Sequence, residues 1–184
     1  IWDPILKASA GFQFHDGENL TQLQDILQEI YLITPNTDEL KTLFGNHPDV
    51  ESLQALARGL NLNILWKGGH NDGALASDRL VTPDKVYTFS VTRTRHGKHG
   101  TGCVLSSAIA SYLTLGYPLP DACRLGQHYV AGFIRSNDTN LGMHNRVEST
   151  ATEVDLYRTP LQYITDYKEG VSIPEQVEAV CKGG

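Results

Sequence analysis

The sequence predicts an α/β fold in which helices cover both faces of a mostly parallel sheet, with antiparallel strands at one edge. Three short apolar runs lack polar alternation, as central parallel strands do: Ile1–Leu6, Ile30–Thr34 and Leu62–Trp66. Segments of helical period lie between these runs. Strand and helix therefore alternate, which implies right-handed crossovers between parallel strands.

Three helices are predicted in the first third of the chain from the spacing of apolar side chains. Apolar residues recur every three to four positions over Leu20–Ile30. A shorter helix is expected over Thr37–Phe44, where Gly45 ends it, and another over Val50–Leu60. Each offers one apolar face with which to cover the sheet.

The middle of the chain, Gly73–Val91, predicts antiparallel strands at the edge of the sheet. Ser77–Asp78 and Asp84–Lys85 are expected to form turns. The alternating residues Val86–Val91 are expected to form a strand. A basic loop that contains glycine follows over Thr92–Gly100.

Two longer helices are predicted in the second half. The first begins at Gly102 and is closed by Gly116. Asp121 is expected to cap the second. Its predicted apolar face comprises Ala122, Leu125, Tyr129, Val130, Phe133 and Ile134. Residues 136–184 are weakly patterned and stay unassigned, within a single partial domain expected over 1–184.

Composition excludes several classes of protein. The 184 residues are 40% hydrophobic and 20% charged, which excludes a disordered chain. With 15 basic against 21 acidic residues the net charge is −6, so general nucleic-acid binding is not expected. No apolar run approaches the ~20 residues that a membrane helix needs. Three Cys without paired spacing indicate a reducing compartment, so we expect a cytoplasmic protein. A homodimer is allowed for separately.

The start of the chain is a further observation. It opens directly on a predicted strand at Ile1, and its only Met is Met143. We therefore expect a trimmed or incomplete N-terminus and a sequence that is a piece of a larger fold.

The most informative segment is His99–Cys103, at the start of the helix predicted from Gly102. Gly100 and Gly102 allow the backbone to turn tightly and to approach a ligand closely. The free N–H groups of the first helical turn, together with the helix dipole, then form an anion hole suited to phosphate. A thiol at this position, Cys103, is expected to have a pKa below its ordinary ~8.5. An ordinary Gly-rich connection with a buried Cys is the alternative.

Two further polar segments directly follow predicted strands, where open parallel sheets bind ligands. Lys67–His70 offers a lysine that can neutralise phosphate charge, although a surface lysine in a Gly-Gly turn has the same pattern. Asn36 and Glu39 could face one ligand or a metal-bound water, since Mg²⁺ prefers a few carboxylates and phosphate oxygens. The alternative for this segment is helix capping by Thr37.

Asp3 lies within the first apolar run, where a carboxylate costs free energy unless it is used or paired. A strand-end Asp that faces solvent is the alternative. All four polar segments fall at the carboxyl ends of predicted strands, or at the helix that faces those ends. This coincidence favours one shared site over four separate surface features.

The order and spacing of these segments resemble those of the ribokinase-like small-molecule kinases. Within that group the sequence resembles the hydroxymethylpyrimidine and phosphomethylpyrimidine kinases of thiamine biosynthesis. The matching segments are D-P-I-L-K-A-S-A-G at 3–11, T-P-N-T-D-E-L at 34–40, W-K-G-G-H at 66–70 and H-G-T-G-C-V-L-S-S-A-I-A at 99–110. The H-G-T-G-C motif discriminates within the group, since sugar and pyridoxal kinases usually carry Asp where Cys103 stands.

The resemblance implies a ribokinase-like three-layer sandwich and two transfers of the ATP γ-phosphoryl, first to the pyrimidine hydroxymethyl group and then to the monophosphate. It implies that Cys103 stands at the general-base position beside the acceptor hydroxyl. Gly100, Thr101, Gly102 and Cys103 together would form the anion hole over the transferring phosphoryl. The remaining implied roles are ATP binding by Asn36, Lys67, Gly68, Gly69 and His70, pyrimidine contact by Ile5 and Cys103, and Mg²⁺ linkage by Asp3 and Glu39.

The resemblance covers about residues 1–134 and departs from the family at both ends. The family's N-terminal third, which supplies the first strands and a Gln-bearing part of the pyrimidine pocket, has no counterpart here. The tail after Asn145 matches no family pattern. Two alternatives follow, a pyridoxal-type kinase of the same fold and a nucleotide-binding piece of a kinase that turns nothing over.

Two other chemistries fit the same residues less well. His96, His99 and Cys103 could suggest zinc, but only three candidate ligands are present and their spacing suits no common structural site. A cysteine phosphatase is not expected, because the position six after Cys103 is Ile109 and not Arg. The anion hole accounts for the cysteine more simply.

Overall fold

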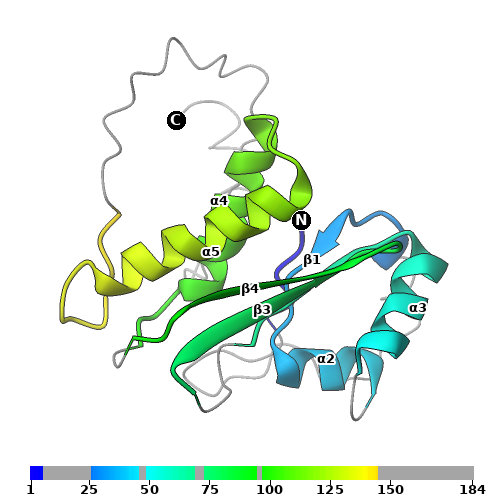
Figure 1. Cartoon of the computed structure of the whole chain (residues 1–184), viewed down its shortest axis with the longest axis horizontal. Coiled ribbons are helices and arrows are strands. Elements are labelled where there is room, and N and C mark those ends of the chain that lie inside the picture. Colours follow the sequence, from blue (N-terminus) through cyan, green and yellow to red (C-terminus); the bar gives the residue numbers. More distant parts are fainter. Residues whose placement is uncertain (6–25, 46–48, 69–72, 95–96, 145–184) are drawn as a thin grey trace, which may run out of the picture. The chain divides into compact units, whose positions relative to one another are not determined.

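The computed structural model describes residues 1–5, 26–45, 49–68, 73–94 and 97–144 (Figure 1). The chain divides into two compact units, Ile1–Val147 and Glu148–Gly184, and all described residues belong to the first. The single domain expected over 1–184 therefore stays a prediction. In the helix predicted over Leu20–Ile30, residues 26–28 are helical, and positions 20–25 lie outside the described residues.

The described sheet has four strands in the order β1-β2-β3-β4. They are β1 (Leu32–Ile33), β2 (Asn63–Trp66), β3 (Leu75–Val81) and β4 (Val86–Thr92). β1 and β2 are parallel, whereas β3 is antiparallel to both β2 and β4. The first predicted run joins the sheet through one parallel bridge between Trp2 and Ile33. The predicted α/β fold with an antiparallel edge is confirmed, and antiparallel pairs outnumber parallel ones among these four strands.

The turn predicted at Ser77–Asp78 is wrong, because both residues lie in the middle of β3. β3 pairs with β4 without interruption from Leu75 opposite Thr92 to Val81 opposite Val86. Turn-forming residue types are overruled here by the ladder of cross-strand hydrogen bonds. The turn predicted at Asp84–Lys85 does lie between the two strands.

Helices cover both faces of the sheet, as a three-layer sandwich requires (Figure 1). On one face lie α2 (Thr37–Phe44) and α3 (Val50–Leu60), and on the other α4 (Thr101–Thr114) and α5 (Leu119–Arg135). Successive strand residues point to opposite faces. The buried side chains that pack toward α2 and α3 include Ile33, Ile64 and Val81, and those that pack toward α4 and α5 include Leu32, Leu65 and Leu80.

The helix boundaries agree with the sequence except at the starts of α4 and α5, and α4 begins at Thr101, one residue before the predicted Gly102. α2 and α3 have the predicted bounds, and Gly116, at φ 86°, follows the end of α4 as expected. Pro118, not Asp121, is the N-cap of α5, because the helix begins at Leu119 and places Asp121 within its first turn. None of the helices in the described ranges is both long enough and apolar enough to cross a membrane.

The buried face of α5 also differs from the predicted one. It includes Cys123, Gly126, Gln127 and Ala131 as well as Ala122, Leu119 and Phe133. Gly126 lets α4 approach closely, since a Cβ at this position would lie 2.8 Å from Cγ1 of Ile109. The small residues of α5 are thus buried because the two helices pack tightly, and Tyr129 is only partly buried.

Candidate active site

A cavity of about 680 Å³ opens where β1 and β2 end and α4 begins. Its lining includes predicted site residues from four separate parts of the chain: Asp3, Ile5, Asn36, Glu39, Lys67, Gly100, Thr101, Gly102 and Cys103. Gly68 does not line it, and Gly69 and His70 lie outside the described residues. The predicted convergence is found, while the chemical role of each residue stays a prediction.

Lys67 is one of the basic residues that line this cavity, and it lies beside two carboxylates. Its Nζ lies 2.8 Å from Oδ1 of Asp3 and 3.8 Å from Oε2 of Glu39. The side chains of Lys67, Asp3 and Glu39 are 17%, 10% and 11% exposed. The hydroxyl of Thr34 also donates a hydrogen bond to Oδ1 of Asp3, at 2.9 Å. Asp3 is therefore no solvent-facing strand end, and Lys67 is no surface lysine.

Asn36 and Glu39 are held together at the start of α2. Oδ1 of Asn36 accepts hydrogen bonds from the backbone N–H groups of Asp38 and Glu39, at 2.9 and 2.8 Å. Oε2 of Glu39 accepts one from the N–H of Asn36 at 2.7 Å, which completes a capping box. Asn36, not Thr37, is thus the N-cap, because its extended backbone places the side chain over the first turn. The cap leaves both side chains beside the cavity.

The pKa of the Glu39 carboxyl is raised. Burial is the largest cause, and it is opposed by the hydrogen bond from Asn36 and by the charge of Lys67. The carboxyl therefore takes up a proton more readily than an exposed glutamate. A cation that enters the cavity would favour the ionised form again.

The first turn of α4 faces the charged cluster. Gly100 is the N-cap and has a left-handed backbone, φ 77° and ψ 7°, and it makes no side-chain cap. A Cβ on Gly102 would lie 3.1 Å from Oδ2 of Asp3 and 3.3 Å from Nζ of Lys67. A side chain at position 102 would therefore push Asp3 and Lys67 away by a few tenths of an ångström, so glycine favours the close approach. Main-chain N–H groups at a helix start and a lysine meet here, which suits phosphate recognition, and the nearby carboxylate of Asp3 would need a cation to offset its charge.

Cys103 lies in the same turn, half-buried and without a disulfide. The expectation of a lowered pKa is wrong. Burial raises the pKa of the thiol, the nearby carboxylate of Asp3 raises it further, and Lys67 opposes both. The helix start favours a thiolate, but the fold places the sulfur in partly apolar surroundings beside a negative charge. The thiol therefore holds its proton in the ligand-free protein.

Asp78 and Gln127 are two buried cavity-lining residues that sequence patterns did not single out. Asp78 accepts hydrogen bonds from the N–H of Gly68 at 3.0 Å and from Nε2 of Gln127 at 2.9 Å. The pKa of Asp78 is raised overall, because the effect of burial exceeds the lowering by these two hydrogen bonds. Oε1 of Gln127 is buried without a partner among the described residues. Two features of the sequence could have pointed to this pair: Asp78 is a carboxylate within a strand, and Gln127 is an amide among the buried residues of α5.

The donor set fits a magnesium ion better than a zinc ion. Within the described ranges, no three His, Cys, Asp or Glu side chains are placed to share a metal. His99 is exposed, and His96 lies outside the described residues. Asp3 and Glu39, however, both line the cavity, and Mg²⁺ commonly takes one or two carboxylates together with water and phosphate oxygens. The predicted Mg²⁺ linkage is compatible with these two residues.

The sheet, the helices on its two faces and the cavity at the strand ends define the ribokinase-like fold of small-molecule kinases. The chain superposes on the pyridoxal kinase from Staphylococcus aureus in complex with ADP with a TM-score of 0.64 and 21% identity, covering 79% of this chain and 59% of that one. The same enzyme in complex with AMP-PCP gives a TM-score of 0.62 at 23% identity, with the same coverage.

Sequence comparison narrows this class. The profile of the phosphomethylpyrimidine kinase family matches residues 1–148, and the chain belongs to this family. It is 36% identical over 142 residues to the thiamine biosynthesis bifunctional protein ThiED from Geobacter sulfurreducens, covering 73% of this chain and 29% of that protein. It is 33% identical over 141 residues to the hydroxymethylpyrimidine/phosphomethylpyrimidine kinase of Staphylococcus aureus strain Mu50, covering 71% of this chain and 51% of that protein. The chain thus spans about half or less of the relatives it matches.

Proposed function

We propose that this chain carries the phosphoryl-transfer site of an ATP-dependent kinase that acts on 4-amino-5-hydroxymethyl-2-methylpyrimidine and on its monophosphate. The observation that carries the proposal is the meeting of the Asp3–Lys67 pair with the first turn of α4, beside Cys103. Membership of the phosphomethylpyrimidine kinase family supports the choice of acceptor. The names of the curated relatives support thiamine biosynthesis as the pathway.

The proposed roles follow from charge and position. The main-chain N–H groups of residues 100–103 would receive the transferring phosphoryl, and Lys67 would neutralise its developing charge. Asp3 and Glu39 would hold Mg²⁺, which would offset the negative charge of the phosphates when it is bound. Asn36 and Gly68–His70 would contact ATP, and Ile5, which is 41% exposed at the cavity, would contact the pyrimidine.

Cys103 is proposed to accept the proton of the acceptor hydroxyl. Because burial and Asp3 raise the pKa of its thiol above 9.0, kcat/KM should still be increasing with pH at 9.0. A base whose pKa were lowered would instead give a plateau from neutral pH. Mg²⁺ held at Asp3 would offset part of the effect of that carboxylate on the thiol, so the pKa seen in kcat should lie below the one seen in kcat/KM.

The test is turnover of the purified chain with ATP–Mg²⁺ and each of three acceptors: the pyrimidine alcohol, its monophosphate and pyridoxal. We expect the first two to be used, and Cys103→Ala to lower kcat by about 10²-fold or more while ATP affinity is retained. Cys123→Ala is the matched control, because Cys123 is 1% exposed in the core and does not line the cavity. Equal turnover in wild type and Cys103→Ala would remove Cys103 from the base role.

A pyridoxal-type kinase is the second candidate, favoured by the superposition on pyridoxal kinase. A higher kcat/KM for pyridoxal than for the pyrimidine alcohol would decide for it. The third candidate is a piece of a kinase that binds nucleotide without catalysis. Calorimetry with ATP–Mg²⁺ tests it, since binding without any turnover would identify such a piece. The cytoplasmic location and a homodimer also stay proposals.

A further inference from the structure

Lys98 is a buried lysine just before the anion hole, and the proposed function does not use it. It lies in the loop between β4 and α4 and is 8% exposed. Within the described ranges its ammonium forms no ion pair with a carboxylate. A buried charge of this kind is costly unless its hydrogen bonds are all satisfied.

Three oxygens beyond the end of α5 satisfy the ammonium. Nζ of Lys98 donates to the backbone carbonyl and to Oδ1 of Asn137, both at 2.8 Å, and to the backbone carbonyl of Thr139. Asn137 follows Ser136, the C-cap of α5, so the partial negative charge of the helix end also favours a cation here. An ammonium has three N–H donors, and three acceptors occupy them. Lys98 therefore has no donor left for a phosphate, although it lines the cavity.

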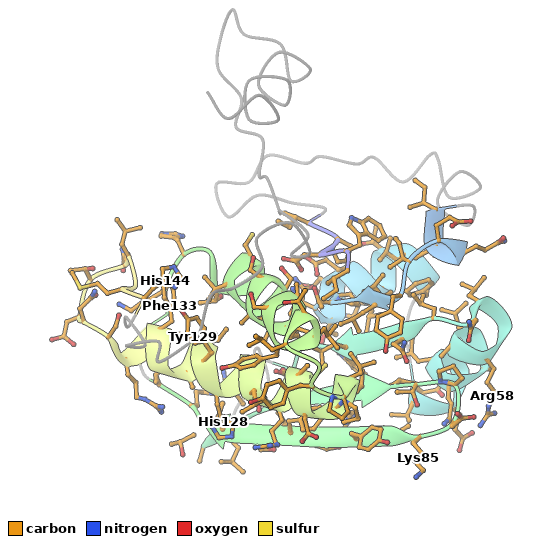
Figure 2. All side chains as sticks on the ribbon, turned by 90° about the horizontal axis from the view of Figure 1, so that it is seen from above. Arg58, Lys85, His128, Tyr129, Phe133 and His144 are labelled. Atoms are coloured by element: carbon orange, nitrogen blue, oxygen red, sulfur yellow. The ribbon has the colours of Figure 1, made fainter. Side chains whose placement is uncertain are left out.

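The turn that holds Lys98 is itself anchored on α5. The rings of Phe133 and His144 lie 4.9 Å apart, and the hydroxyl of Tyr129 lies 2.9 Å from Nδ1 of His144 (Figure 2). Gly142 approaches the ring of Phe133 so closely that a Cβ would overlap it. The N–H of Met143 donates to Oγ of Ser136 at 2.7 Å. The segment after α5 thus folds back onto the helix and forms a fixed support.

The next residue of the loop is tied to the same turn. The N–H of His99 donates to the carbonyl of Asn140 at 3.0 Å, and Gly100 then adopts the left-handed backbone that starts α4. The carbonyl of Gly100 accepts the first helical hydrogen bond, from Val104 at 3.0 Å. Two consecutive residues are therefore fixed immediately before the N–H groups of the anion hole.

We propose that Lys98 is a positioning residue, which fixes the first turn of α4 by clamping the loop to the turn at residues 137–140. The inference rests on the proposed kinase function for its catalytic consequence. Fixed N–H groups stabilise the transferring phosphoryl because no reorganisation is needed during the reaction, and a small displacement of them lowers the rate. The ammonium acts through the loop and does not touch substrate.

The test replaces the ammonium and keeps the stem, as in Lys98→Met. The control is Lys85→Met, at the exposed turn between β3 and β4 (Figure 2). In ligand-free protein, amide exchange at His99 and Val104 should become about tenfold faster or more in Lys98→Met, because a hydrogen-bond network to a charged group is lost there. Exchange of the β2 amides should not change. Lys98→Arg should restore part of the protection.

Kinetics tests the catalytic consequence. Lys98→Met should lower kcat about tenfold, with little change in KM for the alcohol, because the interaction is made in the transition state. Unchanged exchange at His99 and Val104 would overturn the clamp, as would an equal increase in β2. Faster local exchange with unchanged kcat would overturn the positioning role. Wild-type protein without turnover would refute the proposed function, while the exchange experiment still decides on the clamp.

A milder variant covers the case in which Lys98→Met does not fold. Asn137→Ala keeps the lysine and removes one of its three acceptors, together with the two hydrogen bonds that the same oxygen accepts from the N–H and the hydroxyl of Thr139. Exchange at His99 and Val104 should then increase by less than in Lys98→Met but more than in Lys85→Met. Protection equal to that of Lys85→Met would contradict the clamp.

Discussion

Substitution of Lys67 by Met should destabilise the fold in a pH-dependent manner. The change keeps the aliphatic stem and removes the charge that lies 2.8 Å from Asp3 and 3.8 Å from Glu39. Two partly buried carboxylates are then left without their cation. A matched control is available in α2, where Lys41 lies 3.3 Å from Asp38 but the two side chains are 44% and 92% exposed.

The magnitude follows from distance and burial. At an effective dielectric constant of about 20, the two contacts amount to about 6 and about 4 kcal/mol of gross attraction. Most of this offsets the cost of burying the ions, and loss of one partner from a buried pair costs about 3–5 kcal/mol net. Because the three side chains retain some exposure, we expect the lower end, about 3 kcal/mol at neutral pH. Lys41→Met should cost less than about 0.5 kcal/mol.

The pH dependence follows from Glu39. Lys67 is one of the groups that lower the pKa of this carboxyl, so the pKa should rise further in Lys67→Met. A group whose pKa is raised in the folded state contributes stability that is lost as pH increases through that pKa. The difference between variant and wild type should therefore be smaller below the ordinary Glu39 value of 4.5, where only the contact with Asp3 is lost, and should grow as pH increases above it.

Urea denaturation of wild type and both variants at several pH values between about 4 and 8 measures this difference. A cost for Lys67→Met that equals that for Lys41→Met would show that Lys67 is not held in a buried charge cluster. A cost that is large but constant with pH would show that lost packing, and not charge, is the cause.

Three further substitutions test other parts of the structure. Asp78→Asn should gain stability relative to wild type as pH increases above 3.8, because burial raises the pKa of Asp78 in the folded state. Urea denaturation measures this, and a difference in the free energy of unfolding that stays constant with pH would contradict it. Gly126→Ala should lower the free energy of unfolding by about 1–3 kcal/mol, since its Cβ would lie 2.8 Å from a side-chain carbon of α4. Gly132→Ala, which meets nothing within 4 Å, should not destabilise and serves as its control. Gly102→Ala should weaken ATP–Mg²⁺ binding in calorimetry, since its Cβ would lie 3.1 Å from Asp3, while thermal stability changes little because helix propensity increases. Unchanged binding would show that the close approach is not needed.

Local patterns predicted much of this fold. α2 and α3 have the predicted bounds because apolar spacing and end signals are encoded within each helix. The turn predicted at Ser77–Asp78 failed because pairing with β4 is a long-range interaction, and local propensity does not contain it.

The same distinction applies to the site. The positions of Asp3, Lys67 and Cys103 at the strand ends and helix start could be predicted, because topology places them there. The raised pKa of the Cys103 thiol could not, since it depends on burial and on a carboxylate 100 positions away in the chain. Lys98 could be predicted only as part of a basic loop that contains glycine, because its partners lie some 40 positions downstream and beyond a whole helix.

The salt bridge between Asp3 and Lys67 joins residues 64 positions apart, and the helix start that meets it lies further along still. No short stretch of this chain holds the complete constellation. A partly folded molecule therefore lacks it, since closing such long loops comes late in assembly. Binding of nucleotide at the proposed site would then require that the whole sandwich has formed. Nucleotide added to a refolding buffer would shift the equilibrium toward the folded protein.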